Sequence, residues 1–182
     1  MSGNFHIFVE GKEDSFFLQG YLDYLNIPVS AGCIRDIEGE GKLGGQLPTI
    51  DQQLNDGVKV LIVFDANSNC ETKRRKIDRI LESRTVPVFL FPDNRSGGAL
   101  EDVLEKSIKP EHEGVFTCFE NYKACLREKS SEYVLPNKKG KIYSYKEALG
   151  ALDKSQQFAS RYWDFGNSAL APLKDFLTSN IL

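Results

Sequence analysis

The sequence predicts an α/β fold in which a central, mainly parallel sheet of four strands is flanked by helices. Short apolar segments alternate with segments whose apolar residues recur at helical spacing, as far as about residue 106. This alternation is typical of strand-helix-strand units, which build parallel sheets. Each of the four apolar segments also ends in a carboxylate. Because ligands bind beyond the carboxyl ends of parallel strands, we expect these acids along one edge of one sheet.

The first strand, loop and helix are indicated near the amino terminus. Residues 5–9 are mostly apolar, Gly11 interrupts the strand, and apolar side chains recur at helical spacing from about residue 13 to 24. Glu10 lies at the turn between strand and helix. Alone it would be interpreted as the solvated end of a strand, but beside other strand-end acids it becomes a candidate for chemistry.

Three further strands are expected, and each of them ends in an acid. They cover residues 33–37, 58–64 and 86–91, followed by Glu38, Asp65 and Asp93. The middle strand is the most hydrophobic segment of the chain, and we expect it at the centre of the sheet, covered on both faces. The glycine-rich residues 38–45 are expected to form either a flexible lip of the site, with Lys42 as a phosphate contact, or an ordinary connection.

Two predicted helices carry charges that bear on function. The helix over residues 70–81 has a run of cations at Lys73, Arg74, Arg75, Lys76 and Arg79. Such a run is either a solvated helix face or a patch that binds phosphate backbones. The helix that begins near residue 99 has Glu101 and Asp102 in its first turn. Acids at this position either complement the helix dipole or join the strand-end acids in a site.

Beyond Pro110 the pattern indicates helices alone. We therefore expect an α/β domain over residues 1–106 and a helical carboxyl-terminal extension over residues 107–182, packed on the same domain. Residues 135–141 are expected to form a basic loop, and the aromatic cluster at 161–165 is expected to pack between helices.

The composition bears on the ligands and the cellular compartment that we expect for the protein. The formal charge of -3 and the pI near 5.5 do not favour an extended nucleic-acid surface, although clustered Lys or Arg and metal ions can still bind phosphates locally. The four cysteines form no Cys-x-x-Cys pair and are accompanied by two histidines, which argues against zinc and for free thiols in a reducing compartment. No leader sequence or membrane-spanning run is evident, so we expect a soluble, cytoplasmic protein.

Three segments resemble, in order, the motifs of a Toprim domain, the metal-binding module of topoisomerases, bacterial primases, small ribosomal-RNA maturases and OLD-type nucleases. They are Val9-Glu10-Gly11-Lys12-Glu13-Asp14, Phe64-Asp65-Ala66-Asn67 and Gly97-Gly98-Ala99-Leu100-Glu101-Asp102. This resemblance covers roughly residues 4–106. The chain is similar over nearly its whole length to a group of uncharacterised bacterial and archaeal Toprim-like proteins, whose ending resembles residues 162–177.

The resemblance implies a Rossmann-like Toprim fold and a role for each matching residue. Glu10 matches the general acid or base, Asp65 the first metal-binding aspartate and Asn67 the second. Asp14, Glu101 and Asp102 match acids that help to hold the metal in the OLD-type branch. Asn67 departs from the Asp-x-Asp pattern, because its amide oxygen can face Mg²⁺ but brings no charge, and the departure puts metal affinity and activity in doubt.

The function implied is Mg²⁺- or Mn²⁺-dependent chemistry on the phosphodiester bonds of nucleic acid, DNA or RNA, and we predict a nuclease. Hard oxygen ligands select such cations, and phosphodiester cleavage needs mainly charge neutralisation and a positioned nucleophile. The expected nucleic-acid contacts are Lys12, Lys42, Lys73, Arg74, Lys76 and Arg95. Two alternatives stay open: a non-catalytic Toprim-like module in interaction or defence, and a phosphatase-like enzyme that acts on small phosphoesters.

Overall fold

The fold is built around a four-stranded parallel sheet flanked by helices, which confirms the predicted class. The computed structural model describes residues 4–154 and 156–182. The strands are β1 (Phe5–Val9), β2 (Ile34–Asp36), β3 (Lys59–Asp65) and β4 (Val88–Phe91), in the order β2-β1-β3-β4. All neighbouring strands are parallel, with Ile7 opposite both Ile34 and Leu61. The most hydrophobic strand, β3, lies inside the sheet as predicted.

Seven α-helices and three short 3₁₀ helices are found in the described residues. The α-helices are α1 (Lys12–Tyr24), α2 (Leu47–Asn55), α3 (Cys70–Leu81), α4 (Leu100–Lys106), α5 (Glu113–Lys129), α6 (Lys138–Ala148) and α7 (Ala171–Ile181). The 3₁₀ helices are η1 (Glu40–Gln46), η2 (Pro110–His112) and η3 (Ser168–Leu170). None of the helices among these residues is long and apolar enough to cross a membrane.

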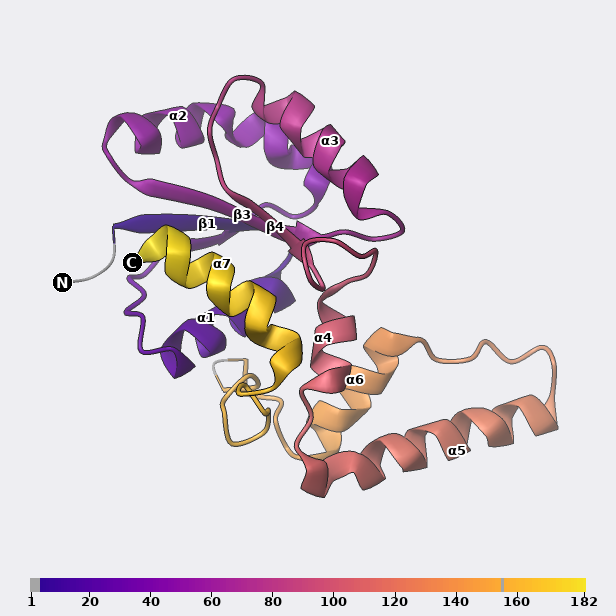
Figure 1. The fold of residues 1–182 in the computed structure, drawn as a ribbon. Helices are drawn as coiled ribbons and strands as arrows, with labels where there is room; N and C mark the ends of the chain where they lie inside the picture. The colour runs from indigo at the N-terminus through magenta and orange to yellow at the C-terminus, as the bar shows by residue number, and fades with distance from the viewer. Residues whose placement is uncertain (1–3, 155) are drawn as a thin grey trace.

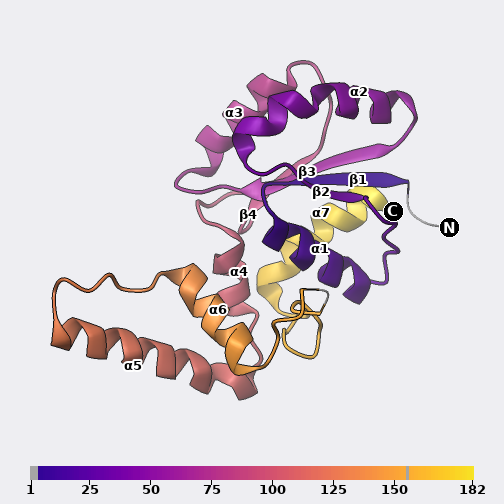
Figure 2. The same ribbon diagram turned by 180° about the vertical axis from the view of Figure 1, so that it is seen from behind.

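Helices cover both faces of the sheet, and alternate strand residues face each layer. In Figures 1 and 2, α2 and α3 lie on one face, while α1 and α7 lie on the other. Ile7 and Val9 of β1 belong to the core on the α1 and α7 side, whereas Phe8 belongs to the core on the α2 and α3 side. Because both of its faces are covered, β1 is mostly apolar instead of alternating between apolar and polar residues.

The strand order places the ends of β1 and β3 next to each other where the chain changes direction. After β1 the chain passes through α1 to β2 on one side of β1, and later places β3 on the other side. The helices that follow β1 and β3, α1 and α3, consequently lie on opposite faces of the sheet (Figure 1). Open α/β sheets bind ligands at such points, and Glu10 and Asp65 stand there.

Two segments that were expected to be loops are helical. The glycine-rich segment forms η1, which is fixed by Leu43, a fully buried side chain within it. The basic residues 138–141 form the first turn of α6, because Asn137 caps that helix by accepting a hydrogen bond from the Gly140 backbone N–H at 3.1 Å. The glycine-rich segment is thus a helical connection between β2 and α2, and the predicted basic loop is confined to residues 135–137.

The region after residue 106 divides between two places. Helices α5 and α6 project together from the end of α4, whereas α7 returns to the sheet and packs on the same face as α1 (Figure 1). The aromatic cluster is buried as predicted: Trp163 is 1% exposed and donates a hydrogen bond from Nε1 to the carbonyl oxygen of Gln157 at 2.8 Å. The packing of α7 makes residues 171–181 part of the core of the α/β layer structure.

Candidate functional site

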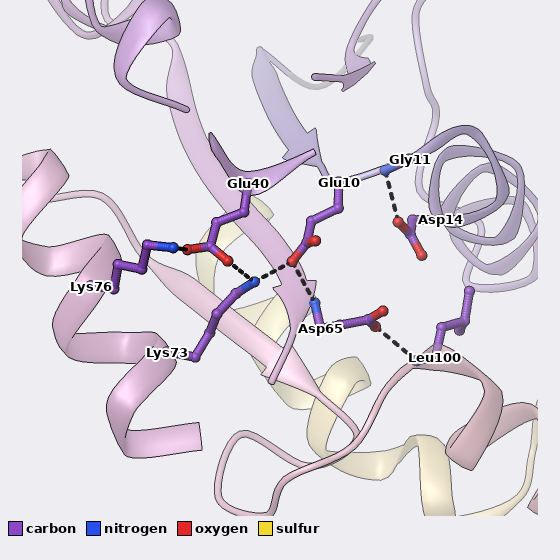
Figure 3. Close-up of polar contacts among 8 residues, drawn as sticks. All are labelled: Glu10, Gly11, Asp14, Glu40, Asp65, Lys73, Lys76 and Leu100. Carbon is purple, nitrogen blue, oxygen red and sulfur yellow. Dashed lines mark hydrogen bonds and ion pairs between the residues drawn. The ribbon is translucent and has the colours of Figure 1, made fainter. Parts of the chain in front are cut away.

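Glu10 follows the last residue of β1 and is held by two hydrogen-bond donors. Its Oε1 accepts a hydrogen bond from the Asp65 backbone N–H at 3.3 Å, which links the ends of β1 and β3. The same oxygen accepts a shorter hydrogen bond, of 2.6 Å, from Nζ of Lys73 on α3. Glu10 thus stands between the end of the sheet and the first turn of a helix (Figure 3).

Asp65 is the last residue of β3 and reaches toward α4. Its Oδ1 accepts a hydrogen bond from the backbone N–H of Leu100, the first residue of α4, at 2.9 Å. A helix amino terminus favours a carboxylate through its unpaired N–H groups. Gly97 lets the β4–α4 loop pack closely against the β3–α3 loop, because a Cβ on Gly97 would lie 2.7 Å from the Ser68 carbonyl oxygen.

Asp14 and Asp102 play the same local role at the starts of two helices. Asp14 Oδ2 accepts a hydrogen bond from the Gly11 N–H at 2.9 Å, and Asp102 Oδ2 accepts one from the Ala99 N–H at 2.8 Å. Their surroundings differ, because Asp102 also forms an ion pair with Lys138. Asp14 instead faces the acids of the sheet edge, as Figure 3 shows.

Carboxylates from separate elements share one cavity of about 900 Å³. Glu10, Asp14, Asp65 and Glu101 line it, and so does Glu38 after β2. Its apolar walls come from α4 and from the carboxyl-terminal part of the chain, at Leu100, Leu104, Ile142, Tyr143 and Phe158. Asp93 follows β4 but lines a different hollow, so only three of the four strand-end acids lie together.

Burial and mutual repulsion raise the pKa values of two of these acids. Burial is the main cause for Asp14, and the charges of Asp65, Glu10 and Glu101 add to it, which raises its pKa to about 7. The pKa of Asp65 rises to about 6, again first through burial and then through Glu101 and Glu10. The hydrogen bonds from Gly11 and Leu100 oppose these shifts without cancelling them. This part of the cavity therefore carries negative charge that is poorly compensated.

Asp102 shows the opposite behaviour. Partial burial would raise its pKa, but the hydrogen bond and charge of Lys138 and the hydrogen bond from Ala99 lower it below its ordinary value. Because Asp14 and Asp102 cap their helices in the same way, their different pKa values arise from the neighbours that the fold supplies.

The donor chemistry of the cavity fits a hard divalent cation, although the side chains are not gathered around one point. Seven carboxylates line the cavity and offer the oxygen ligands that Mg²⁺ and Mn²⁺ prefer, and two of them, Asp14 and Asp65, are desolvated and lie near other acids. Within the described residues, no group of three or more His, Cys, Asp or Glu side chains is arranged to hold a metal ion. The cavity therefore fits a divalent cation in the type and charge of its ligands, but its side chains are not arranged around a single ion.

The residue expected as the second metal ligand, Asn67, lies apart from the cavity lining. Its side chain is exposed, and its backbone N–H donates to the Gly98 carbonyl oxygen at 2.7 Å. Its φ of 55° is in the left-handed region, which Asn adopts more readily than most residues. Asn67 is thus used here to join the β3–α3 and β4–α4 loops. Asp102 does not line the cavity either.

The six predicted nucleic-acid contacts are distributed among different surroundings. Lys12 lines the cavity, and Lys42 pairs with Glu38. Arg74 donates to the Val88 carbonyl oxygen and to Asn94, so it fastens α3 to the end of β4. Arg95 lines the hollow of Asp93, and Lys76 pairs with Glu40.

Lys73 does not belong to an exposed basic face, so that expectation is wrong for this residue. It is 6% exposed and contacts Glu10 and Glu40. The sequence holds a signal for this, because Lys73 falls on the same helical stripe as Cys70, Ile77 and Leu81, all of which are buried. Interpreting the stripe before the charge would have placed Lys73 inside.

Sequence reasoning also missed the contribution of α6 to the site. Lys139 and Lys146 of this helix line the cavity. Nζ of Lys139 lies 3.8 Å from a carboxylate oxygen of Glu101, and Nζ of Lys146 lies 2.7 Å from one of Glu13 on α1. The basic composition of 138–141 was visible, but contacts over such sequence separations have no local signature.

Comparisons with known proteins agree with this architecture. A family model described as "Protein of unknown function (DUF3226)" matches residues 4–181. The solved structure of the C-terminal region of the Burkholderia pseudomallei OLD protein is similar in fold, with a TM-score of 0.56 and 13% sequence identity over 100% of each chain. No curated protein matches the chain. The chain belongs to the family described as a protein of unknown function, DUF3226.

Proposed function

We propose that the carboxylate cavity is the active site of a Toprim-like nuclease that depends on Mg²⁺ or Mn²⁺ and cleaves phosphodiester bonds of DNA or RNA. The observation that carries the proposal is that Glu10, Asp65 and two acids of helix starts, Asp14 and Glu101, line one cavity at the switch point of the sheet. The order of the Toprim-like motifs and the likeness in fold to the OLD protein region support it.

We assign two roles to the acids of the cavity: metal ligand, and general acid or base. Asp14, Asp65 and Glu101 would hold the cation, because they share the poorly compensated part of the cavity. A bound divalent cation neutralises charge on phosphoryl oxygens. Glu10 is the candidate general acid or base, and both hydrogen bonds that the described residues donate to it go to Oε1. Its other oxygen is the one that we assign to proton transfer.

Two lysines of the cavity have the chemistry to contact the phosphate backbone. Lys12 lies at the start of α1, and Lys139 lies at the start of α6. Both place positive charge in the same cavity as the acids, which suits a substrate that brings phosphate to carboxylates. Because the net charge of the protein is -3, this local arrangement is what would attract a nucleic acid.

A non-catalytic Toprim-like module is the second candidate, and two observations favour it. Glu10 is bound by Lys73 instead of being free to exchange protons at both oxygens. No three acids of the described chain are arranged around one point. A module of this kind would keep the fold and the cavity but would cleave nothing.

Cleavage of labelled single- and double-stranded DNA and RNA with millimolar Mg²⁺ or Mn²⁺ tests the proposal. We expect cleavage by the wild type that EDTA abolishes and that Glu10→Gln and Asp65→Asn reduce by at least about a hundredfold. Glu71→Gln is the matched control, since it removes an exposed acid that pairs with Arg75 outside the cavity. Absence of cleavage of all four substrates with both metals would favour the non-catalytic module.

A further inference from the structure

Lys73 places a positive charge inside the protein between two carboxylates. Its side chain is 5% exposed, and its Nζ lies 2.6 Å from Oε1 of Glu10 and 2.5 Å from Oε2 of Glu40. Glu40 comes from η1 and Glu10 from the end of β1, so one ammonium joins three elements (Figure 3). The aromatic ring of Phe64 also lies beside the ammonium, with its centroid 5.6 Å from Nζ.

The charges around this ammonium are balanced. Glu40 has a second partner in Lys76, whose Nζ lies 2.7 Å from Oε1, so that two acids face two cations. Burial would lower the pKa of Lys73, but the hydrogen bonds and charges of Glu10 and Glu40 outweigh it and raise the pKa above its ordinary value. Lys73 is therefore a permanent cation.

The neighbouring part of the cavity lacks such a partner. Asp14, Asp65 and Glu101 contribute three acids, and the one ion pair recorded to them among the described residues is that of Glu101 with Lys139. Nζ of Lys139 is 3.8 Å away, and the Lys139 side chain is 75% exposed. Solvent screens an exposed ammonium at this distance much more than a buried one.

We propose that the ammonium of Lys73 occupies the place between Glu10 and Glu40 that a divalent cation would otherwise take. The protein then binds one divalent cation, in the half of the cavity formed by Asp14, Asp65 and Glu101, and carries the second positive charge as a side chain. The assignment of the first cation rests on the proposed function, whereas the role of Lys73 concerns only its own two carboxylates.

The geometry explains why an ammonium suits this place. Its Nζ lies within hydrogen-bond distance of one oxygen from each of two carboxylates, so that it can donate a charge-assisted hydrogen bond to each. Without a cation between them, the two carboxylates would repel each other in a poorly solvated position. Removal of Lys73 should therefore increase the affinity of this position for a cation from solution. A divalent cation is the small ion best able to bind there with oxygen ligands.

A purely structural role for Lys73, as a tie between α3 and η1, makes a different prediction. Loss of a tie weakens the fold without creating a cation site. Lys76 provides the matched control, because it lies on the same helix and contacts the same Glu40, but its side chain is 62% exposed. Replacement of Lys73 and of Lys76 by Met changes the net charge equally and differs in burial.

The test counts bound Mn²⁺ by electron paramagnetic resonance of the free ion and by calorimetry. We expect one Mn²⁺ per chain for the wild type and for Lys76→Met, and two for Lys73→Met. Lys73→Arg keeps the buried charge and should not gain a cation. If Lys73→Met is unfolded without metal, its helical circular dichroism should return as Mn²⁺ is added.

The outcomes separate this inference from the proposed function. If the wild type binds no Mn²⁺ while Lys73→Met binds one, the proposed site fails and the role of Lys73 is supported. The inference is overturned if Lys73→Met gains no cation over the wild type, if the wild type already binds two, or if Lys73→Met stays unfolded at saturating Mn²⁺.

Discussion

The acidic edge of the sheet has two halves that use carboxylates in opposite ways. In one half, Glu10 and Glu40 enclose the buried Lys73, and every charge has a partner within hydrogen-bond distance. In the other half, Asp14 and Asp65 accept hydrogen bonds from backbone N–H groups, and burial together with neighbouring acids raises the pKa of each. The carboxylates of the first half are neutralised by lysines, whereas those of the second have no buried cation beside them, and that is where we propose a divalent cation binds.

A strand-end acid therefore does not define a site by itself. Glu10 and Asp65 stand at the ends of neighbouring strands. Glu10 accepts a hydrogen bond from a lysine of α3, whereas Asp65 accepts one from a backbone N–H at the start of α4. The helix that faces each strand end therefore determines whether the protein supplies a cation to its acid.

The largest effect should come from breaking the balanced half. We expect Lys73→Ala to lower the free energy of unfolding by about 3 kcal/mol or more, because it leaves two partly buried carboxylates unpaired. Lys76→Ala removes an exposed partner of Glu40 and should cost less than about 1 kcal/mol. Urea denaturation measures both, and equal losses would contradict the difference between the buried and the exposed cation.

In the absence of metal, the acids of the poorly compensated half should make the free energy of unfolding depend on pH. The pKa of Asp14 is raised from 3.8 to about 7, so the folded protein holds this proton more tightly than the unfolded chain. Its contribution to stability is complete below about pH 4 and is lost as the pH rises through about 7; Asp65 acts likewise up to about pH 6. The wild type should therefore lose this contribution between pH 4 and 7.

Asp14→Asn isolates this effect, because its amide oxygen can still accept the Gly11 hydrogen bond. At pH 8 we expect the variant to be more stable than the wild type by about 1–2 kcal/mol in EDTA, with the gap closing toward pH 4. Chemical denaturation at several pH values measures the gap. A gap that is independent of pH would show that Asp14 does not titrate as described.

How much of this arrangement can be predicted from the sequence depends on the range of the interaction. The boundaries of α3, at residues 70 and 81, follow from local periodicity and the Asn69 cap, and the parallel sheet follows from the alternation of elements. The acids Glu10, Asp14, Asp65 and Glu101 were identified in advance and lie in one cavity. Their roles in catalysis and metal binding stay predictions.

The remaining features of the site depend on contacts between distant segments. Glu40 meets Lys73 over 33 residues, and Glu13 meets Lys146 over 133. Asn67 was assigned a ligand position by motif, but its left-handed backbone and exposed side chain follow from the loop that Gly98 joins. Motif spacing places a residue in the right loop without fixing where its side chain lies.

The smallest effect should come from Asn67→Asp, which restores the second aspartate of the Asp-x-Asp pattern. Because the Asn67 side chain is exposed and outside the cavity lining, Asn67→Asp should change the Mn²⁺ affinity by less than about threefold. Asp14→Asn, inside the cavity, should weaken it by about tenfold or more. Calorimetry measures both constants, and a tenfold tightening by Asn67→Asp would return that residue to the ligand set.

We propose that the half of the edge around Asp65 accepts a divalent cation, and metal-dependent melting tests this claim without any assay of cleavage. With Mg²⁺ at about a hundred times its Kd, binding adds about 2.7 kcal/mol, which raises the Tm of a chain of this size by about 5–10 °C. We expect this rise for the wild type and for Glu71→Gln, and its loss in Asp65→Asn. No rise in the wild type with Mg²⁺ or Mn²⁺, or an equal rise in Asp65→Asn, would contradict the claim.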